Sequence, residues 1–216
     1  MTYTEYVKRY LKQKEYGSPV YISEIAEALA DHYGIDRNKA AADASATVKS
    51  IADKGCMPEL RRYRKGIYYR TTETAFGELG IDREKLIADR YILPDRGYET
   101  GPRLLNLMGL TSQVPAVRII ASNAAKGGVR YDERLGESVR PPRAYVTAEN
   151  RACLQVLDAL EMIDRAPVDA EDPYGLVAGH IRDRALDYET LLYYADRYYG
   201  RKTVIRLAHT AGLSRT

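Results

Sequence analysis

Several features that are common in proteins are scarce in this chain of 216 residues, which has no Trp, one Phe and two Cys. No stretch approaches the roughly 18 consecutive apolar residues of a membrane span, and the first residues lack the basic-then-apolar pattern of a secretory signal. We therefore expect a soluble, cytoplasmic protein with no membrane partner. Cys56 and Cys153 lie far apart and outside any Cys-x-x-Cys motif, which favours buried free thiols over a metal site.

Catalytic motifs are also missing from the sequence. His32, His180 and His209 are isolated, so there is no His-x-x-x-His ligand pair. Neither the Gly-x-Ser-x-Gly elbow of hydrolases nor the Gly-x-x-x-x-Gly-Lys-Ser/Thr phosphate loop occurs. The predicted strands lack the Glu-x-Lys element of metal-dependent nucleases. The sequence thus predicts a protein that is not an enzyme and that has no catalytic residues, no metal and no cofactor.

The net charge of +3 is small, but its distribution is uneven. Residues 1–72 contain 13 Lys and Arg against 9 Asp and Glu, whereas the rest contains 20 against 21. Within residues 60–70 there is no acid and there are five basic residues, namely Arg61, Arg62, Arg64, Lys65 and Arg70. Solvated runs of charge are common, but a run beside a helical module favours contact with phosphates.

The N-terminal third follows a recognisable order of elements. Apolar periodicity predicts helices over residues 4–14, from Ser23 to about 33, and over 37–54, with Ser23 and Asp36 as N-caps. A short strand over 20–22 precedes the second helix, and strands over 57–63 and 67–70 meet at Lys65-Gly66. This order is typical of a winged helix-turn-helix, which we expect to occupy residues 1–72.

In such a module the third helix and the hairpin would contact DNA. Helical spacing turns Ala41, Ala44, Val48 and Ile51 inward and leaves a small, weakly polar outer face. An alternative is that this face is simply solvated and rich in Ala. The candidate DNA-binding residues are Asn38, Ser45 and Lys49 on the helix, and Arg61, Arg62, Arg64 and Lys65 on the hairpin.

The remaining sequence predicts two further regions, which makes the fold class α+β. Residues 73–145 alternate short helical and strand patterns, as in a small α+β domain. Residues 146–216 are helical throughout, and we expect them to pack on the middle domain, to bind a partner or to form a homodimer. Lys126 lies in a predicted turn, Ala124–Gly128, and Arg130 lies in a short strand predicted over 129–131. Two interpretations are open: these cations carry charge to a partner or to nucleic acid, or they are simply solvated, which is the usual state of turn lysines and the interpretation we favour.

Two blocks carry a resemblance to a known family. One is the basic hairpin that closes in Lys65-Gly-Ile-Tyr-Tyr69. The other is Gly97-Tyr-Glu-Thr-Gly101 through Leu105, followed by Gly109-Leu-Thr-Ser-Gln-Val-Pro115 and a hydrophobic strand. Over about residues 4–143 the chain resembles the AbiEi-like antitoxins of type IV toxin–antitoxin systems.

This resemblance implies both a function and two partners. The N-terminal module would bind double-stranded DNA at its own operator and repress the operon. The following domain would counteract a cognate toxin that resembles a nucleotidyltransferase, with or without direct contact. Two alternatives are a plain winged-helix transcription regulator with a ligand-sensing or dimerising C-terminal domain, and a nucleic-acid enzyme that docks through the winged helix.

Overall fold

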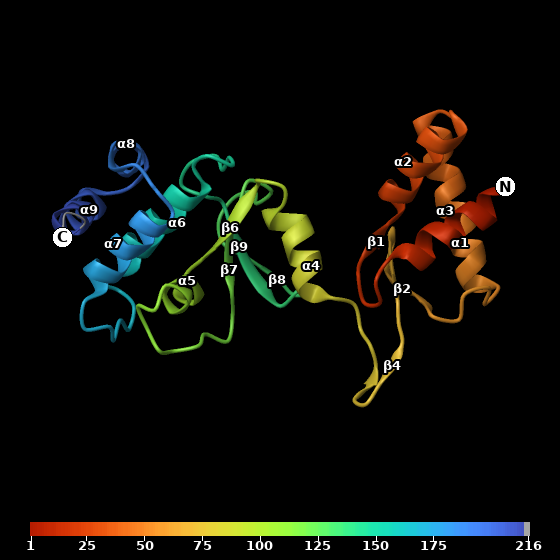
Figure 1. Ribbon diagram of the computed structural model, residues 1–216, viewed down its shortest axis with the longest axis horizontal. Coiled ribbons are helices and arrows are strands. Elements are labelled where there is room, and N and C mark those ends of the chain that lie inside the picture. The colour runs from red at the N-terminus through yellow and green to blue at the C-terminus, as the bar shows by residue number, and fades with distance from the viewer. Residues whose placement is uncertain (214–216) are drawn as a thin grey trace. The chain divides into compact units, whose positions relative to one another are not determined.

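The computed structural model describes residues 1–213 and has a mixed α+β architecture. The chain divides into two compact units, Met1–Leu86 and the part from Ile87 onward, which are described separately (Figure 1). None of the helices within residues 1–213 is both long enough and apolar enough to cross a membrane.

In the first unit, helices α1 (Tyr3–Gln13), α2 (Ile22–Tyr33) and α3 (Arg37–Asp53) surround one hydrophobic core. Helix α1 begins with a capping box, in which the Thr2 hydroxyl accepts from the Glu5 N–H and the Glu5 carboxylate accepts from the Thr2 N–H. Asp36 caps α3, as predicted, and its side chain accepts from the N–H groups of Asn38 and Lys39.

Two local predictions for these helices are wrong. Ser23 is not a cap, because α2 already begins at Ile22, whose N–H donates to the Gly66 carbonyl and so joins the helix directly to the sheet. Ala41 is exposed, and the buried stripe of α3 starts one residue earlier, at Ala40, because it advances by four residues to Ala44 and Val48.

Strands β1 (Val20–Tyr21), β2 (Leu60–Arg64) and β3 (Ile67–Arg70) form an antiparallel sheet in the order β1-β3-β2. The register between β2 and β3 shifts between Arg62 and Arg64. Gly66 turns the β2–β3 hairpin with a φ of +80°, a conformation that favours glycine. The turn end of the hairpin is therefore fixed twice, by Gly66 itself and by the pairing of β1 with Ile67 and Tyr68.

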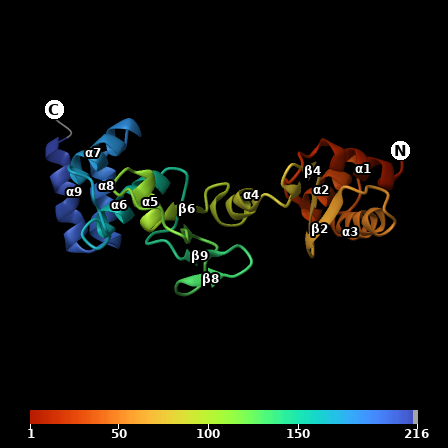
Figure 2. The same cartoon turned by 90° about the horizontal axis from the view of Figure 1, so that it is seen from below.

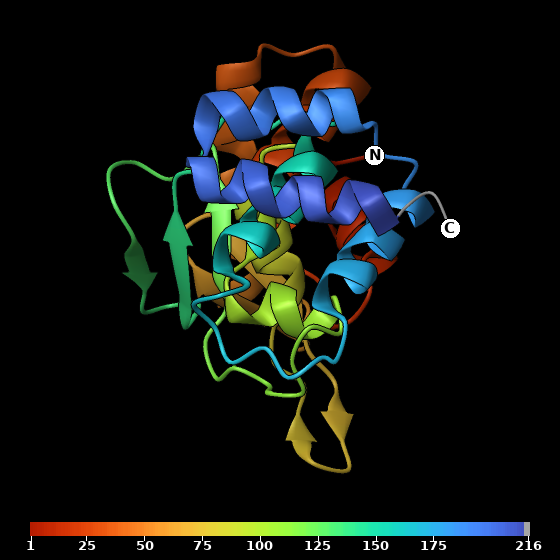
Figure 3. The ribbon, with the colours of Figure 1, turned by 90° about the vertical axis from the view of Figure 1, so that its left-hand side faces the viewer.

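The first unit extends beyond the predicted boundary at residue 72. After β3 comes a second hairpin of β4 (Glu73–Thr74) and β5 (Gly77–Glu78), drawn in gold in Figure 3. The chain then returns to the first core, where the Asp82 N–H donates to the Gly17 carbonyl and Lys85 pairs with Glu15 at 2.8 Å. These bonds attach residues 73–86 to the first unit, and the division falls inside helix α4 (Arg83–Ile87).

The second unit is built around a four-stranded sheet in the order β6-β7-β9-β8. A π-helical turn (Ala88–Ile92) leads to β6 (Gly97–Thr100), helix α5 (Pro102–Leu107) and strands β7 (Ile119–Ser122), β8 (Arg130–Asp132) and β9 (Glu137–Arg140). Strands β7 and β9 are parallel, and the other neighbouring pairs are antiparallel.

Four helices complete the second unit and lie together on one side of the sheet (Figures 1 and 2). They are α6 (Arg151–Met162), α7 (Pro173–Asp183), α8 (Tyr188–Tyr198) and α9 (Arg201–Leu213). Tyr98 and Leu105 from the sheet region share one core with Leu157, Leu191 and Leu207 from the helices. The strands and α5 of the region before residue 146 and the helices α6 to α9 therefore bury their apolar side chains in one common core.

The two cysteines differ in exposure. Cys153 on α6 is buried, as expected, but Cys56 is exposed. Cys56 follows Gly55 in the turn after α3, where Met57 and Leu60 fill the neighbouring core positions.

Candidate nucleic-acid interface

The predicted contact residues of α3 share one exposed face. Asn38, Ser45 and Lys49 fall within an arc of about 40° at 100° per residue, opposite the buried stripe, and all three are exposed. Ala42 and Ala46, also exposed, keep this face small. The face can therefore approach a flat or grooved partner closely and still offer an amide, a hydroxyl and an ammonium group.

The start of α3 adds cations that the sequence analysis did not single out. Arg37 and Lys39 are exposed in its first turn. The Asp36 carboxylate occupies the N–H groups of Asn38 and Lys39, at 2.9 and 3.2 Å, so these groups are not available to an anion. This end of α3 thus offers side chains and not a free helix N-terminus.

Three of the predicted hairpin cations are available for binding. Arg62 and Lys65 are exposed, and Arg64 is half-buried. Within residues 1–213 their side chains make no hydrogen bond and no ion pair. They are grouped by the turn at Gly66, so the tip of the hairpin concentrates positive charge that the described part of the chain does not neutralise.

Arg61 is in a different position, because its Nε lies 2.8 Å from the Glu78 carboxylate and its guanidinium also donates to the Pro58 carbonyl. Both partners of this ion pair are about half exposed, since their side chains retain 44% and 45% of their accessible surface. The β4–β5 hairpin therefore supplies a competitor for any phosphate at Arg61.

Arg70, the last cation of the basic run, is a structural residue. It is 8% exposed and donates to the carbonyls of Lys12 and Lys14, both at 2.9 Å, at the C-terminal end of α1. Its guanidinium also lies 4.2 Å from the centre of the Tyr16 ring and 3.7 Å from Glu59. A cation in this place satisfies the last carbonyls of the helix and does not face solvent.

The hairpin tyrosines also separate into two classes. Tyr68 is 6% exposed and belongs to the core of the first unit, whereas Tyr63 and Tyr69 are half-buried. Only the latter two retain surface that a nucleic acid could touch.

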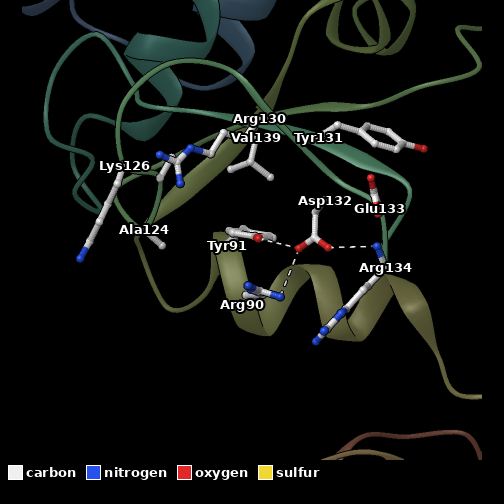
Figure 4. A pocket seen from close by; sticks show the side chains of 11 residues that line it. Arg90, Tyr91, Ala124, Lys126, Arg130, Tyr131, Asp132, Glu133, Arg134 and Val139 are labelled. Carbon is white, nitrogen blue, oxygen red and sulfur yellow. Dashed lines mark hydrogen bonds and ion pairs between the residues drawn. The ribbon is translucent and has the colours of Figure 1, made fainter.

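The second unit contains a basic cavity of about 520 Å³ between the π-helical turn and strands β8 and β9 (Figure 4). At its centre Asp132 accepts from the Tyr91 hydroxyl at 2.8 Å and lies 3.1 Å from Arg90. Burial alone raises the pKa of Asp132, but the Tyr91 hydroxyl, the Arg90 charge and the N–H groups of Leu135 and Arg134 outweigh it and hold the pKa below its usual range. Asp132 is therefore an ionised anchor for Arg90 and for the β8–β9 turn.

A larger cavity of about 710 Å³ lies between β9 and the ends of α6 and α8. Its arginines are largely used within the protein. Arg140 lies 2.5 Å from Asp158, Arg143 lies 2.5 Å from Glu161, and Arg197 donates to the Tyr193 hydroxyl. Because α6 and α8 point their C-terminal ends at this cavity, their dipoles favour the cations already present.

Asp158 is the centre of this second network. It is 1% exposed and accepts from Thr100 at 2.6 Å and from the Tyr199 hydroxyl at 2.8 Å, in addition to Arg140. Burial raises the pKa of Asp158, and the Arg140 charge opposes this effect. The Tyr98 hydroxyl is buried nearby without a well-aligned hydrogen bond among the described residues. This network ties β6, β9, α6 and the end of α8 together.

No protein-family model matches the chain, and no curated protein matches it. Within residues 1–213 no three side chains of His, Cys, Asp or Glu come together where they could hold a metal ion.

Proposed function

We propose that the first unit is a winged helix-turn-helix and that the protein is a DNA-binding transcriptional autorepressor and antitoxin of a type IV toxin–antitoxin system. The DNA-binding part of this proposal rests chiefly on the charges at the tip of the β2–β3 hairpin. There Arg62, Arg64 and Lys65 make no side-chain hydrogen bond or ion pair within residues 1–213. The element order α1-β1-α2-α3-β2-β3 and the sheet order β1-β3-β2 support the same proposal.

In this proposal α3 lies in the major groove of double-stranded operator DNA. Asn38 and Ser45 would donate to base edges, and Lys49 would contact a phosphate. The small side chain of the exposed Ala42 would let the helix lie close to the floor of the groove. The hairpin cations would contact the backbone or the adjacent minor groove. If Lys49 and the three hairpin cations each neutralise one phosphate, the logarithmic salt slope is about −3.6.

The antitoxin half rests on the resemblance of residues 97–115 to AbiEi-like antitoxins. This resemblance assigns to the second unit the activity against a cognate toxin that resembles a nucleotidyltransferase. The alternative is a plain winged-helix regulator whose second unit senses a ligand or dimerises. The basic cavity of the second unit is an observation in favour of ligand sensing. A toxin gene beside this one, and relief of that toxin's growth arrest by this chain, would favour the antitoxin.

The first experiment is a gel-shift series at increasing salt with the purified chain and the DNA upstream of its own gene. We expect a shift that survives an excess of unrelated competitor DNA and that weakens with the slope given above. Equal competition by unrelated DNA would contradict operator recognition. Co-expression with the neighbouring toxin-like gene would then test the antitoxin half independently, because growth rescue does not require a DNA shift.

A further inference from the structure

The turn between β7 and β8 and the start of β8 carry two cations for which residues 1–213 provide no ion pair. Lys126 and Arg130 line the basic cavity of about 520 Å³, and their side chains make no hydrogen bond or ion pair in the described part of the chain. In Figure 4 both lie on one side of the cavity, whereas Glu133 and Tyr131 lie on the other. An incoming anion on the Lys126 side would therefore meet two cations and no acid on that side.

The backbone of this turn adds donors. The N–H groups of Lys126, Gly127 and Gly128 have no acceptor within residues 1–213. Gly127 has a φ of +75°, a left-handed conformation that recurs in turns whose successive N–H groups converge on an anion. A Cβ at Gly127 would lie 3.5 Å from Nη2 of Arg130, so the guanidinium lies beside the turn.

The net charge of the cavity lining indicates which class of anion would bind there. Four cations, Arg90, Lys126, Arg130 and Arg134, stand against the acids Asp132 and Glu133. The carboxylate of Asp132 is already used by Arg90, Tyr91 and the β8–β9 turn. The excess of two positive charges suits a phosphate group, which carries about −1.5 to −2 at neutral pH. The volume falls in the range of about 300–1,000 Å³ that is usual for small-ligand sites.

From these observations we propose that the second unit binds the phosphate group of a nucleotide or of a nucleic-acid strand, through Lys126, Arg130 and the N–H groups of the turn between them. Arg90, held by Asp132, lines the same cavity. This site is separate from the β2–β3 hairpin and does not depend on DNA binding by the first unit. It gives the second unit a ligand of its own.

The test is calorimetric titration of the full chain with three probes: inorganic phosphate, ATP and a single-stranded dodecanucleotide. Because the first unit carries its own cations, the dodecanucleotide is titrated into a chain that also carries Arg64→Ala and Lys65→Ala. Two variants are compared with this reference. One is Lys126→Ala with Arg130→Ala, and the other is Arg182→Ala with Arg201→Ala, which removes the same charge from exposed positions on α7 and α9.

We expect at least one probe to bind, and its affinity to fall at least tenfold in the Lys126/Arg130 variant but less than twofold in the control. ATP binding tighter than that of the dodecanucleotide would identify a free nucleotide as the source of the phosphate, and the reverse order would identify a strand. Absence of heat with all three probes at about millimolar concentration would overturn the proposal. Equal losses in the two variants would overturn it as well, because net charge alone would then explain the binding. Thermal unfolding of each variant verifies that the turn substitutions leave the fold intact.

Discussion

The β2–β3 hairpin of the first unit and the β7–β9 region of the second unit present positive charge in opposite ways. The hairpin carries five cations in eleven residues with no acid, but Arg70 is buried and Arg61 is paired with Glu78. In the second region cations alternate with acids along the chain. The fold then brings Asp132 to Arg90, whereas Lys126 and Arg130, on one side of a cavity, form no ion pair with any residue that the structure describes. The run of charge in the first region therefore suggests more available cations than the folded hairpin has. The mixed sequence of the second region suggests fewer than its surface has.

The largest effect on stability is expected when a cation that is paired inside the second unit is removed. Arg140→Ala leaves the Asp158 carboxylate, 1% exposed, without its cation. We expect a loss of about 3–5 kcal/mol in the free energy of unfolding, because an uncompensated buried charge is costly. Arg130→Ala, on the neighbouring strand, should change stability by no more than about 0.5 kcal/mol. Urea unfolding of both variants measures the difference.

A second pair of substitutions separates charge from packing at this site. Arg140→Met combined with Asp158→Leu removes both charges, and we expect it to recover most of the stability that Arg140→Ala loses. A double variant as unstable as Arg140→Ala would mean that the hydrogen bonds around the pair contribute as much as its charge. These are the contacts of Arg140 with Thr100 and the Pro141 carbonyl, and those that Asp158 accepts from Thr100 and Tyr199.

The first unit offers the same contrast within one hairpin. Arg70→Ala removes the donor to the Lys12 and Lys14 carbonyls and should destabilise the first unit by about 2–3 kcal/mol, as expected for charged hydrogen bonds in a buried site. Arg62→Ala, two strand pairs away on β2, should be nearly neutral. Denaturant unfolding measures both variants, and equal stabilities would contradict the structural role given to Arg70.

The outline of the first unit could be predicted from the sequence because its signals are local. Apolar periodicity, the Asp36 cap and the glycine at the hairpin turn act over a few residues, and they yield helices and strands within a few residues of the observed bounds. The hydrogen-bond partners of Arg70 lie 56 and 58 residues away in the chain, and no local sequence pattern predicts them. The same holds for Asp82 and Gly17, whose bond moves the boundary of the unit from residue 72 to 86.

The cavity of the second unit could not be predicted for a related reason. The sequence favours solvated side chains for Lys126 and Arg130, and both are exposed. Their common cavity depends on the pairing of β8 with β9 and on the π-helical turn that brings Arg90 and Tyr91 to Asp132. The spacing of residues in the sequence does not indicate this cavity, because residues 90 and 132 are distant in the sequence and come together only in the folded chain.

Binding measurements sharpen the comparison at the hairpin tip. Arg64→Ala with Lys65→Ala removes two of the three free cations, so operator affinity should fall about tenfold at moderate salt and the salt slope should drop by about 1.8. Arg9→Ala with Lys12→Ala, exposed on α1, removes the same charge and serves as the control. Gel shifts at several salt concentrations measure both quantities. An unchanged slope would contradict phosphate contact by the hairpin tip.

The smallest expected effect concerns the pH dependence of Asp132. The pKa of Asp132 in the folded protein lies below its usual range, so its interactions with Tyr91 and Arg90 stabilise the second unit fully at neutral pH, well above the unfolded pKa of about 3.9. This contribution is lost as the pH falls through the folded pKa, because protonation removes the charge that Arg90 contacts. Asp132→Asn should therefore be less stable than the unmodified chain near neutrality, and the gap should narrow on acidification. Denaturant midpoints of both proteins, measured from pH 7 to pH 3, provide the comparison. A gap that is constant with pH would show that the side chain acts as a neutral hydrogen-bond acceptor and that its charge is not what holds Arg90 at the cavity.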